Sequence, residues 1–287
     1  MRQDIIDLYD EYTHERLDRR VFMDRLASIA GGTAAAAALV PLLEASSAKA
    51  AIVAADDPRL QTERITFPGA AGDVQGYLAR PAEMAGALPG VVVIHENRGL
   101  NPHIEDVARR MALEGFVALA PDFLSSQGGT PDDRDQAREM IRALDQQQTI
   151  TDAVAAVAFL KDHEATTGKV GVVGFCWGGA LANQVAVNSA DVAAAVPFYG
   201  RQPSAEDAAK IKTRLLLHYA GLDDRINAGI PEYEQALKDA GVDYTIYIYD
   251  GANHAFHNDT SEARYDPDAA ELAWSRTIEF FKQYLGS

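Results

Sequence analysis

From Val91 onward, short apolar runs alternate with longer segments of helical periodicity. The run at 91–94 is apolar at every position, which suits a strand buried on both faces of a parallel sheet. Further strand-like segments cover residues 116–120, 170–174, 193–198, 214–219 and 244–249, and a hairpin of two strands precedes them at 63–67 and 74–80. Helical patterns cover residues 104–114, a long or broken region at 135–163, 231–240 and 268–284. This alternation predicts a mostly parallel eight-stranded α/β sheet flanked by helices.

The first fifty residues differ from the rest. Residues 18–23 read DRRVFM, which is similar to a twin-arginine export signature; an Ala-rich apolar stretch (27–43) and the A-x-A-type site 48–50 follow. Six acidic residues precede Arg19, however, which is unlike an export signal. The alternative is a retained pair of helices, with apolar faces formed by Ile5, Ile6, Leu8, Tyr9 and Tyr12 and by Val21, Phe22, Leu26 and Ile29.

These two interpretations share one domain organisation but predict two different cellular locations. Residues 1–50 are a helical arm or a signal segment, 51–62 a linker, and 63–287 one catalytic domain. Export would make the protein periplasmic and retention would leave it cytoplasmic. A retained arm could dock on the domain or on a second copy, giving a homodimer. The apolar stretch is short for a membrane span, and Gly31 and Gly32 interrupt it, so we expect no stable membrane insertion.

Composition narrows the classes of partner. The chain has 287 residues, 47% of them hydrophobic, which is ample for a core. The net charge is −16 without a basic cluster, so nucleic acid and anionic membrane surfaces are unexpected partners. A single cysteine excludes an internal disulfide framework and any multi-thiolate metal site. No metal or organic cofactor is expected.

That cysteine, Cys176, stands in the sequence GVVGFCWGGA, where an apolar run ends in a glycine and small residues follow. The pattern G-x-Nuc-x-G between a strand and a helix predicts a nucleophile elbow, with sulfur in the place of the more usual serine. Gly174 and Gly178 flank the turn where side chains would press on the neighbouring strand or helix. A lone cysteine is otherwise a small buried hydrophobe.

An acid and a base follow in the order nucleophile, acid, histidine, at the ends of later strands. Asp223 lies in the pattern G-x-D-x-x-aliphatic, and its neighbour Asp224 is the alternative acid. His254 follows the last strand and would take the thiol proton and return it to the leaving group. The other histidines have weaker claims: His95 ends a strand, His218 lies within one, and His103 and His163 fall on surface helix regions.

Two backbone N–H groups would form the oxyanion hole. One belongs to Trp177, directly after the nucleophile, and the other to Asn97, after the 91–94 strand. The reactive form of cysteine is the thiolate, which the helix N-terminus and His254 would stabilise.

Together these residues resemble the dienelactone hydrolases, or carboxymethylenebutenolidases, of the α/β-hydrolase superfamily. The resemblance runs from about Val74 to the C-terminus and rests on the motifs HExxGLN at 95–101, APD at 120–122, GFCWGG at 174–179, GxD at 221–223 and HxF at 254–256. It implies that Glu96 approaches the resting thiol and helps to generate the thiolate; the spacing alone leaves Glu96 as a loop carboxylate.

The chain departs from the family pattern after His254. Members that act on dienelactones bind the substrate carboxylate with arginines, one shortly after the catalytic histidine, whereas residues 255–260 read AFHNDT. Arg98 and Arg201 could supply a cation from other loops, although each could equally be a surface ion-pair partner. Tyr199, which follows the 193–198 strand, and Phe256, in the motif HxF, complete the candidate substrate-binding residues.

The sequence thus predicts a cysteine hydrolase for a small lactone, ester or thioester, acting through a thioacyl-enzyme. The alternatives are a general carboxylesterase or acyl-transfer enzyme, and a non-catalytic redox sensor that uses Cys176 as an oxidisable switch. The loop from Arg201 to Thr213 is too short for a large lid, so we expect an open pocket that a retained arm would partly cover.

Overall fold

The computed structural model describes residues 1–15, 17–44 and 51–286, and its centre is one eight-stranded sheet. The strand order is β1-β2-β4-β3-β5-β6-β7-β8; β1 and β2 are antiparallel to their neighbours and all other pairs are parallel. The strands are β1 (Leu60–Gly69), β2 (Gly72–Pro81), β3 (Leu88–Ile94), β4 (Val117–Asp122), β5 (Thr166–Phe175), β6 (Val192–Phe198), β7 (Arg214–Ala220) and β8 (Tyr244–Tyr249). The predicted mostly parallel sheet is therefore confirmed.

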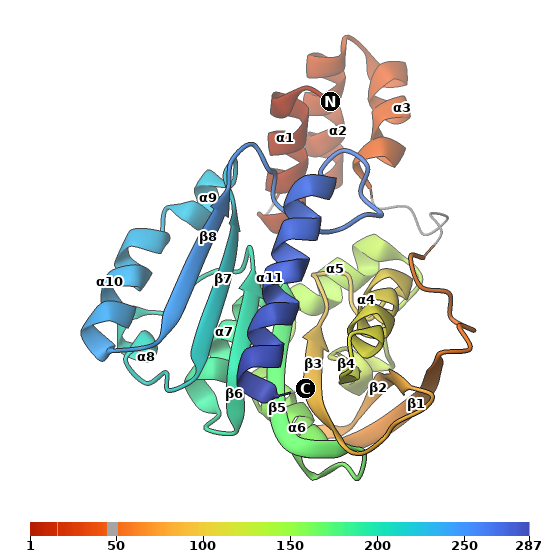
Figure 1. Ribbon diagram of the computed structural model, residues 1–287. Coiled ribbons are helices and arrows are strands. Elements are labelled where there is room, and N and C mark those ends of the chain that lie inside the picture. Colours follow the sequence, from red (N-terminus) through yellow and green to blue (C-terminus); the bar gives the residue numbers. More distant parts are fainter. Residues whose placement is uncertain (16, 45–50, 287) are drawn as a thin grey trace.

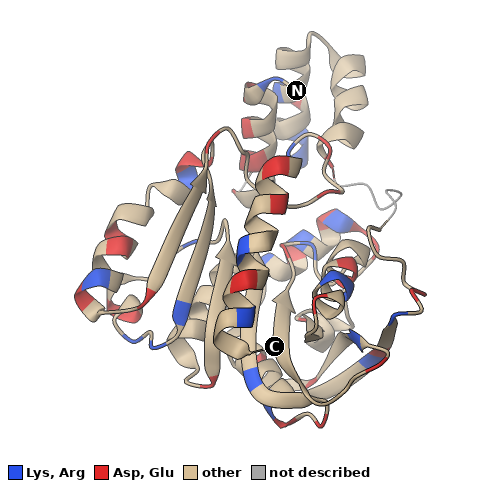
Figure 2. Ribbon diagram, in the orientation of Figure 1, with Lys and Arg blue, Asp and Glu red and all other residues tan. Residues whose placement is uncertain are grey.

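Helices cover both faces of this sheet (Figure 1). One face packs on α4 (Pro102–Leu113) and α11 (Pro267–Leu285), and the other on α6 (Gln146–Asp162), α7 (Trp177–Asn188) and α10 (Ile230–Ala240). Short helices lie in the connections: η1 (Ser125–Gln127), α5 (Arg134–Arg142), α8 (Ala205–Ala208) and α9 (Asp224–Asn227). Acidic and basic residues are interspersed along the outer helices and the strand ends (Figure 2).

The element boundaries differ from the predicted ones in a few places. β1 begins at Leu60, inside the segment predicted as a linker. The long helical pattern at 135–163 is two helices, because residues 143–145 leave the helix and Asp145 caps α6 through its side chain. Ile94 and Gly174 are register partners in β3 and β5, so the segments after these strands meet at one edge of the sheet.

Three helices form the N-terminal arm: α1 (Gln3–His14), α2 (Arg19–Ala30) and α3 (Thr33–Leu43). All five residues of the predicted apolar face of α1 are buried. On the predicted apolar face of α2, Phe22 and Leu26 are buried. The retained pair of helices differs from the structure in two respects. Val21 is 40% exposed rather than on the buried face, and residues 33–43 form a third helix beyond the predicted pair, after Gly31 ends α2 with a positive φ of 84°.

The arm lies against the catalytic domain, at the edge of the sheet where β3 and β5 end (Figure 1). Arg264, which is buried, donates to Asp10 at 3.1 Å and stacks on the ring of Tyr9. Arg138 lies over the ring of Tyr12, with 4.2 Å from its guanidinium carbon to the ring centroid. Further contacts join Gln3 to Asn253, Tyr12 and Arg19 to Asp135, and Arg142 to the carbonyl of Glu15.

No single helix in the described ranges is long and apolar enough to cross a membrane. The pair α2 and α3 passes by length and composition only when taken together, and it is bent by 110° at the break. The predicted cleavage site at 48–50 lies outside the described residues.

Candidate active site

Cys176 stands at a sharp turn between β5 and α7, with a φ of 57° and a ψ of −114°. A positive φ is unusual for a residue with a side chain and is strained outside tight turns. The flanking glycines permit this turn. A Cβ at Gly174 would collide with the carbonyl of Gly178, and one at Gly178 would collide with the carbonyl oxygens of Ile94 and His95. The predicted elbow is thus present in the backbone.

His254 and Asp223 form a buried pair beside this turn. His254 Nδ1 bonds Asp223 Oδ2 at 2.5 Å, and Asp224, the alternative acid, is exposed. Nε2 of His254 lies within 4.8 Å of the Cys176 sulfur and has no hydrogen-bond partner among the described residues. Burial acts to lower the pKa of His254, but Asp223 and Cys176 outweigh it and raise that pKa to about 10. Burial likewise acts to raise the pKa of Asp223, and the attraction of His254 lowers it.

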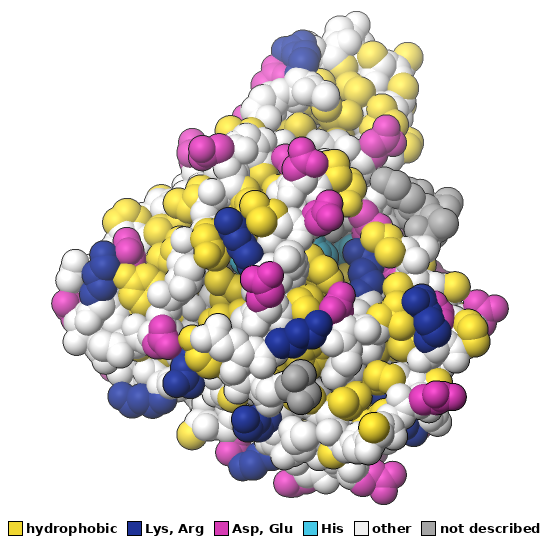
Figure 3. Space-filling view, in the orientation of Figure 1, with side chains coloured by type: hydrophobic (Ala, Val, Ile, Leu, Met, Phe, Trp, Pro, Cys, Tyr) yellow, Lys and Arg dark blue, Asp and Glu magenta, His cyan; other side chains and the backbone are white. Residues whose placement is uncertain are grey.

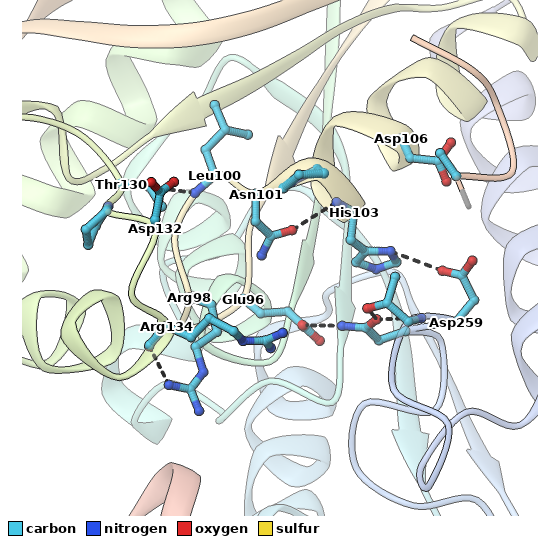
Figure 4. Close-up of a pocket in the computed structure, with 15 residues that line it drawn as sticks. Glu96, Arg98, Leu100, Asn101, His103, Asp106, Thr130, Asp132, Arg134 and Asp259 are labelled. Carbon is cyan, nitrogen blue, oxygen red and sulfur yellow. Dashed lines mark hydrogen bonds and ion pairs between the residues drawn. The ribbon is translucent and has the colours of Figure 1, made fainter. Parts of the chain in front are cut away.

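Glu96 follows β3 and is 7% exposed. Its Oε2 accepts a hydrogen bond from Asn258 Nδ2 at 2.6 Å, whereas Oε1 is buried without a partner in the described part of the chain. Figure 4 shows the carboxylate reaching into a cavity between Arg98 on one side and the loop of Asp259 on the other. An unpaired buried carboxylate oxygen is costly, so it marks a place where a partner is expected.

The arm reaches the sulfur itself. His14, the last residue of α1, places Nε2 at 3.1 Å from Cys176 Sγ. Its ring packs edge-on against His254, with 4.4 Å between centroids. Burial and the neighbouring positive charge of His254 hold the pKa of His14 well below its ordinary value, so this imidazole is neutral.

The two predicted oxyanion donors belong to residues near the sulfur: Trp177 follows Cys176 in the chain, and Asn97 lines the same small cavity as Cys176. Trp177 is the first residue of α7, so its N–H has no partner within the helix. Its ring stacks on His95 with centroids 5.2 Å apart. Asn97 contacts the arm, because its side chain donates to the carbonyl of Thr13 at 3.1 Å.

The space around Cys176 is small, because the arm covers part of the pocket, as expected for an arm that is retained. The cavity that Cys176 and His254 line has a volume of about 20 Å³, since Tyr9, Thr13 and His14 of the arm form part of its wall. A larger cavity of about 440 Å³ adjoins it, and histidine surface is visible in a hollow below the arm (Figure 3). Four residues line both cavities: Glu96, Arg98, Arg134 and Asn258.

The candidate substrate-binding residues divide into two groups. Arg98 is buried and lines both cavities, donating to the carbonyl of Arg134 and pairing with Asp135 at 3.2 Å. Tyr199 and Phe256 are buried, with the Tyr199 ring 5.0 Å from that of His254 and 5.4 Å from that of Phe256. Arg201 is exposed and lines a separate cavity with Trp177 and α7, so the structure does not bring it to Cys176.

Sequence reasoning missed two residues and misplaced a third. Nothing in the local sequence signalled that His14 would reach Cys176, because the contact spans 162 positions. Asn258 stands four residues after His254, within the motif region, and this nearness was the available signal. His103, predicted on a surface helix region, is 8% exposed because its Nδ1 pairs with Asp259 at 3.1 Å.

Among the described residues, one group of side chains has the composition and spacing of a metal site. It consists of His14, Cys176 and His254, whose ligand atoms all lie within 4.8 Å of one another.

The fold and the elbow define the class as α/β-hydrolase, and comparison with known proteins defines the family. The sequence profile of the dienelactone hydrolase family matches residues 74–285, about three quarters of the chain. The chain therefore belongs to the dienelactone hydrolase family and is a hydrolase of that type. A second profile, described as YqhI-like, matches residues 1–32 of the arm.

Three individual proteins are similar to this chain over most of their own length. Protein usf of Aquifex pyrophilus is 39% identical over 222 residues, covering 74% of this chain and 94% of that protein. A Methylorubrum extorquens protein, provisionally named carboxymethylenebutenolidase, is 33% identical, covering 81% of this chain and 84% of its own. The crystal structure of a dienelactone hydrolase-like promiscuous phosphotriesterase from metagenomic libraries is 26% identical with a TM-score of 0.71, covering 79% and 100% of the two chains.

Proposed function

We propose that this protein hydrolyses a small lactone, ester or thioester through a covalent thioacyl-enzyme, with Cys176 as the nucleophile. One observation carries the proposal. The strained elbow presents the sulfur within 4.8 Å of the imidazole Nε2 of His254, whose other nitrogen is bonded to Asp223. Strain of this kind persists where the surrounding structure enforces it, and functional sites are where it clusters.

The chemistry would proceed in two halves. The Cys176 thiolate attacks the carbonyl carbon, the bond to the leaving oxygen or sulfur breaks, and His254 gives its proton to the leaving group. Water then attacks the thioester, His254 takes a proton from that water, and the acid departs with regeneration of the thiolate. Asp223 would keep the imidazole in the correct orientation throughout; its bond of 2.5 Å to Nδ1 supports this role.

The raised pKa of His254 supports its role as the proton donor to the leaving group. Asp223 and Cys176 raise that pKa to about 10, which favours the protonated imidazole beside the sulfur. The N–H of Trp177 at the start of α7 and the N–H of Asn97 would bind the developing oxyanion, and the helix N-terminus favours the same negative charge.

Glu96 would act as the thiol activator. The unpaired Oε1 in the wall shared by the two cavities supports a role that changes when substrate enters. Arg98 lines the same wall and would meet the carboxylate of a carboxylate-bearing acyl compound in exchange for Asp135, its present partner. The name of the Methylorubrum relative refers to such a lactone, which extends the proposal to carboxylate-bearing lactones.

A substrate panel tests this function. The panel contains activated esters, thioesters, lactones with and without a carboxylate, and an activated phosphotriester, because the metagenomic relative is titled a phosphotriesterase. We expect hydrolysis of at least one carbonyl substrate and a loss of about a thousandfold or more in kcat/KM for Cys176→Ala. No hydrolysis across the panel, with only peroxide-dependent oxidation of Cys176, would favour the redox-sensor alternative.

A further inference from the structure

The arm brings a third metal-binding side chain to the catalytic centre. His14 Nε2 lies at 3.1 Å from Cys176 Sγ, and the two histidine rings pack at 4.4 Å between centroids. The three atoms His14 Nε2, Cys176 Sγ and His254 Nε2 all lie within 4.8 Å of one another. A tetrahedral zinc ion with ordinary bond lengths of about 2.0–2.3 Å separates neighbouring ligand atoms by about 3.3–3.7 Å, so small movements would close the set.

We propose that His14, Cys176 and His254 form a binding site for a borderline-soft divalent cation such as Zn²⁺. One thiolate and two imidazoles are ligands that select Zn²⁺ over the hard cations Mg²⁺ and Ca²⁺. Three protein ligands leave the fourth tetrahedral position open.

The surroundings orient both histidines for this role. A metal-binding histidine ordinarily donates its other N–H to a carboxylate or a backbone carbonyl, which fixes the tautomer and aims the lone pair. His254 Nδ1 meets the carboxylate of Asp223 at 2.5 Å, and His14 Nδ1 meets the carbonyl of Asp10 at 3.0 Å. Both Nε2 atoms are thereby turned toward the sulfur.

An independent sign of a missing partner is His254 Nε2 itself. His254 is 2% exposed, and its Nε2 has no hydrogen bond within the described ranges. A buried polar atom of this kind ordinarily has a protein, water or ion partner.

The adjoining space suits a fourth ligand. The cavity of about 20 Å³ that these three residues line can hold about one water molecule. Glu96 also lines it, and the unpaired Oε1 of Glu96 could accept a hydrogen bond from a metal-bound water.

The consequence for activity rests on the proposed function. An ion at this site would occupy the nucleophile and the base together, so Zn²⁺ would inhibit hydrolysis reversibly. Since one ligand comes from the arm, ion binding and arm docking would stabilise each other.

The test uses the full chain, stripped of metal with a chelator and titrated with Co²⁺ and then Zn²⁺. We expect one Co²⁺ per chain, with a thiolate-to-cobalt charge-transfer band and the intense visible bands of tetrahedral cobalt, and displacement of both by Zn²⁺. His14→Gln should weaken Zn²⁺ binding by at least about tenfold. His163→Gln, at the end of α6, is the matched control and should leave affinity unchanged.

Absence of the charge-transfer band, or equal affinity and spectra in wild type and His14→Gln, would overturn the site. Zn²⁺ that bound as expected but increased hydrolysis would overturn the inhibitory role. Metal binding is read without substrate, so a protein that binds cobalt as expected but hydrolyses nothing would refute the proposed function and leave the site standing.

Discussion

At the scale of single residues, the position of the Cys176 sulfur depends on the absence of side chains at the neighbouring residues Gly174 and Gly178. The carbonyl oxygens of Ile94 and His95 lie so close to Gly178 that a Cβ at this position would collide with both of them. Backbone atoms cannot give way as a flexible side chain can.

Gly178→Ala should therefore destabilise the protein by about 3 kcal/mol or more, measured by urea unfolding. Gly86→Ala is the control, because a Cβ at Gly86 meets no atom within 4 Å, and its effect should stay within about 0.5 kcal/mol. Similar small losses for both variants would contradict the close approach at the elbow.

The carboxylate of Glu96 offers a second test at this scale. Glu96→Gln retains an oxygen that can accept from Asn258 but removes the negative charge. If Glu96 helps to generate the thiolate, kcat/KM for an activated ester should fall about 10- to 100-fold, with a slower reaction of Cys176 with iodoacetamide. Glu105→Gln, on α4, is the matched control. Unchanged kinetics in Glu96→Gln would leave Glu96 as an ordinary loop carboxylate.

At the scale of elements, the strands and the elbow could be predicted from sequence because their determinants are local. A buried parallel strand is an unbroken apolar run, and the prediction of β6 at 193–198 is within one residue of its bounds, Val192–Phe198. Asp223 and His254 could be placed because each follows a strand whose end lies at the active edge of the sheet. The break between α5 and α6 and the start of β1 could not be placed, since capping and edge pairing depend on the rest of the fold.

The strand β7 carries a histidine whose hydrogen bonds require the neutral form. His218 accepts from Tyr249 at 2.9 Å on β8 and donates to Thr277 at 3.2 Å on α11. Thr277 in turn donates to the carbonyl of Ala273, so its oxygen is free to accept. Burial, aided by the positive charge of Arg276, lowers the pKa of His218 to about 3.

Stability should accordingly fall with acidification. The unfolded chain binds a proton at this residue below about pH 6.5, whereas the folded chain does so only near pH 3. Its contribution is complete above about pH 6.5 and is lost toward pH 3, at roughly 1.4 kcal/mol per pH unit. Urea unfolding from about pH 6 to 4 should show wild type losing this much more than His218→Gln. Parallel curves for the two proteins would contradict a neutral, buried His218.

At the scale of the whole molecule, the arm was the part that sequence could not place. Its apolar faces were readable, but its docking depends on contacts such as Arg264 with Asp10, which join residues 254 positions apart. Those contacts bring Tyr9, Thr13 and His14 into the wall around Cys176. The pocket is therefore partly covered by the arm, as the alternative of a retained arm predicts.

Weakening the arm should expose the sulfur. Tyr12 stacks on Phe22 at 4.5 Å, lies beneath Arg138 and donates to Asp135 at 2.9 Å. Tyr12→Ala removes all three contacts at a cost of about 3–5 kcal/mol. We expect the rate of Cys176 alkylation by iodoacetamide to rise about tenfold or more. Val21→Ala, a substitution at an exposed position of α2, should leave the rate unchanged. An unchanged rate in Tyr12→Ala would show that the arm does not limit access.

The central claim is that Cys176 becomes acylated, and mass spectrometry of the quenched reaction tests it most directly. Protein mixed with p-nitrophenyl acetate should carry one acetyl group, mapped to the peptide of Cys176 and accumulating in His254→Ala because the second half-reaction loses its base. The adduct should be absent from Cys176→Ala. Hydrolysis by Cys176→Ala at the wild-type rate, or an acetyl group mapped only to another residue, would contradict the account.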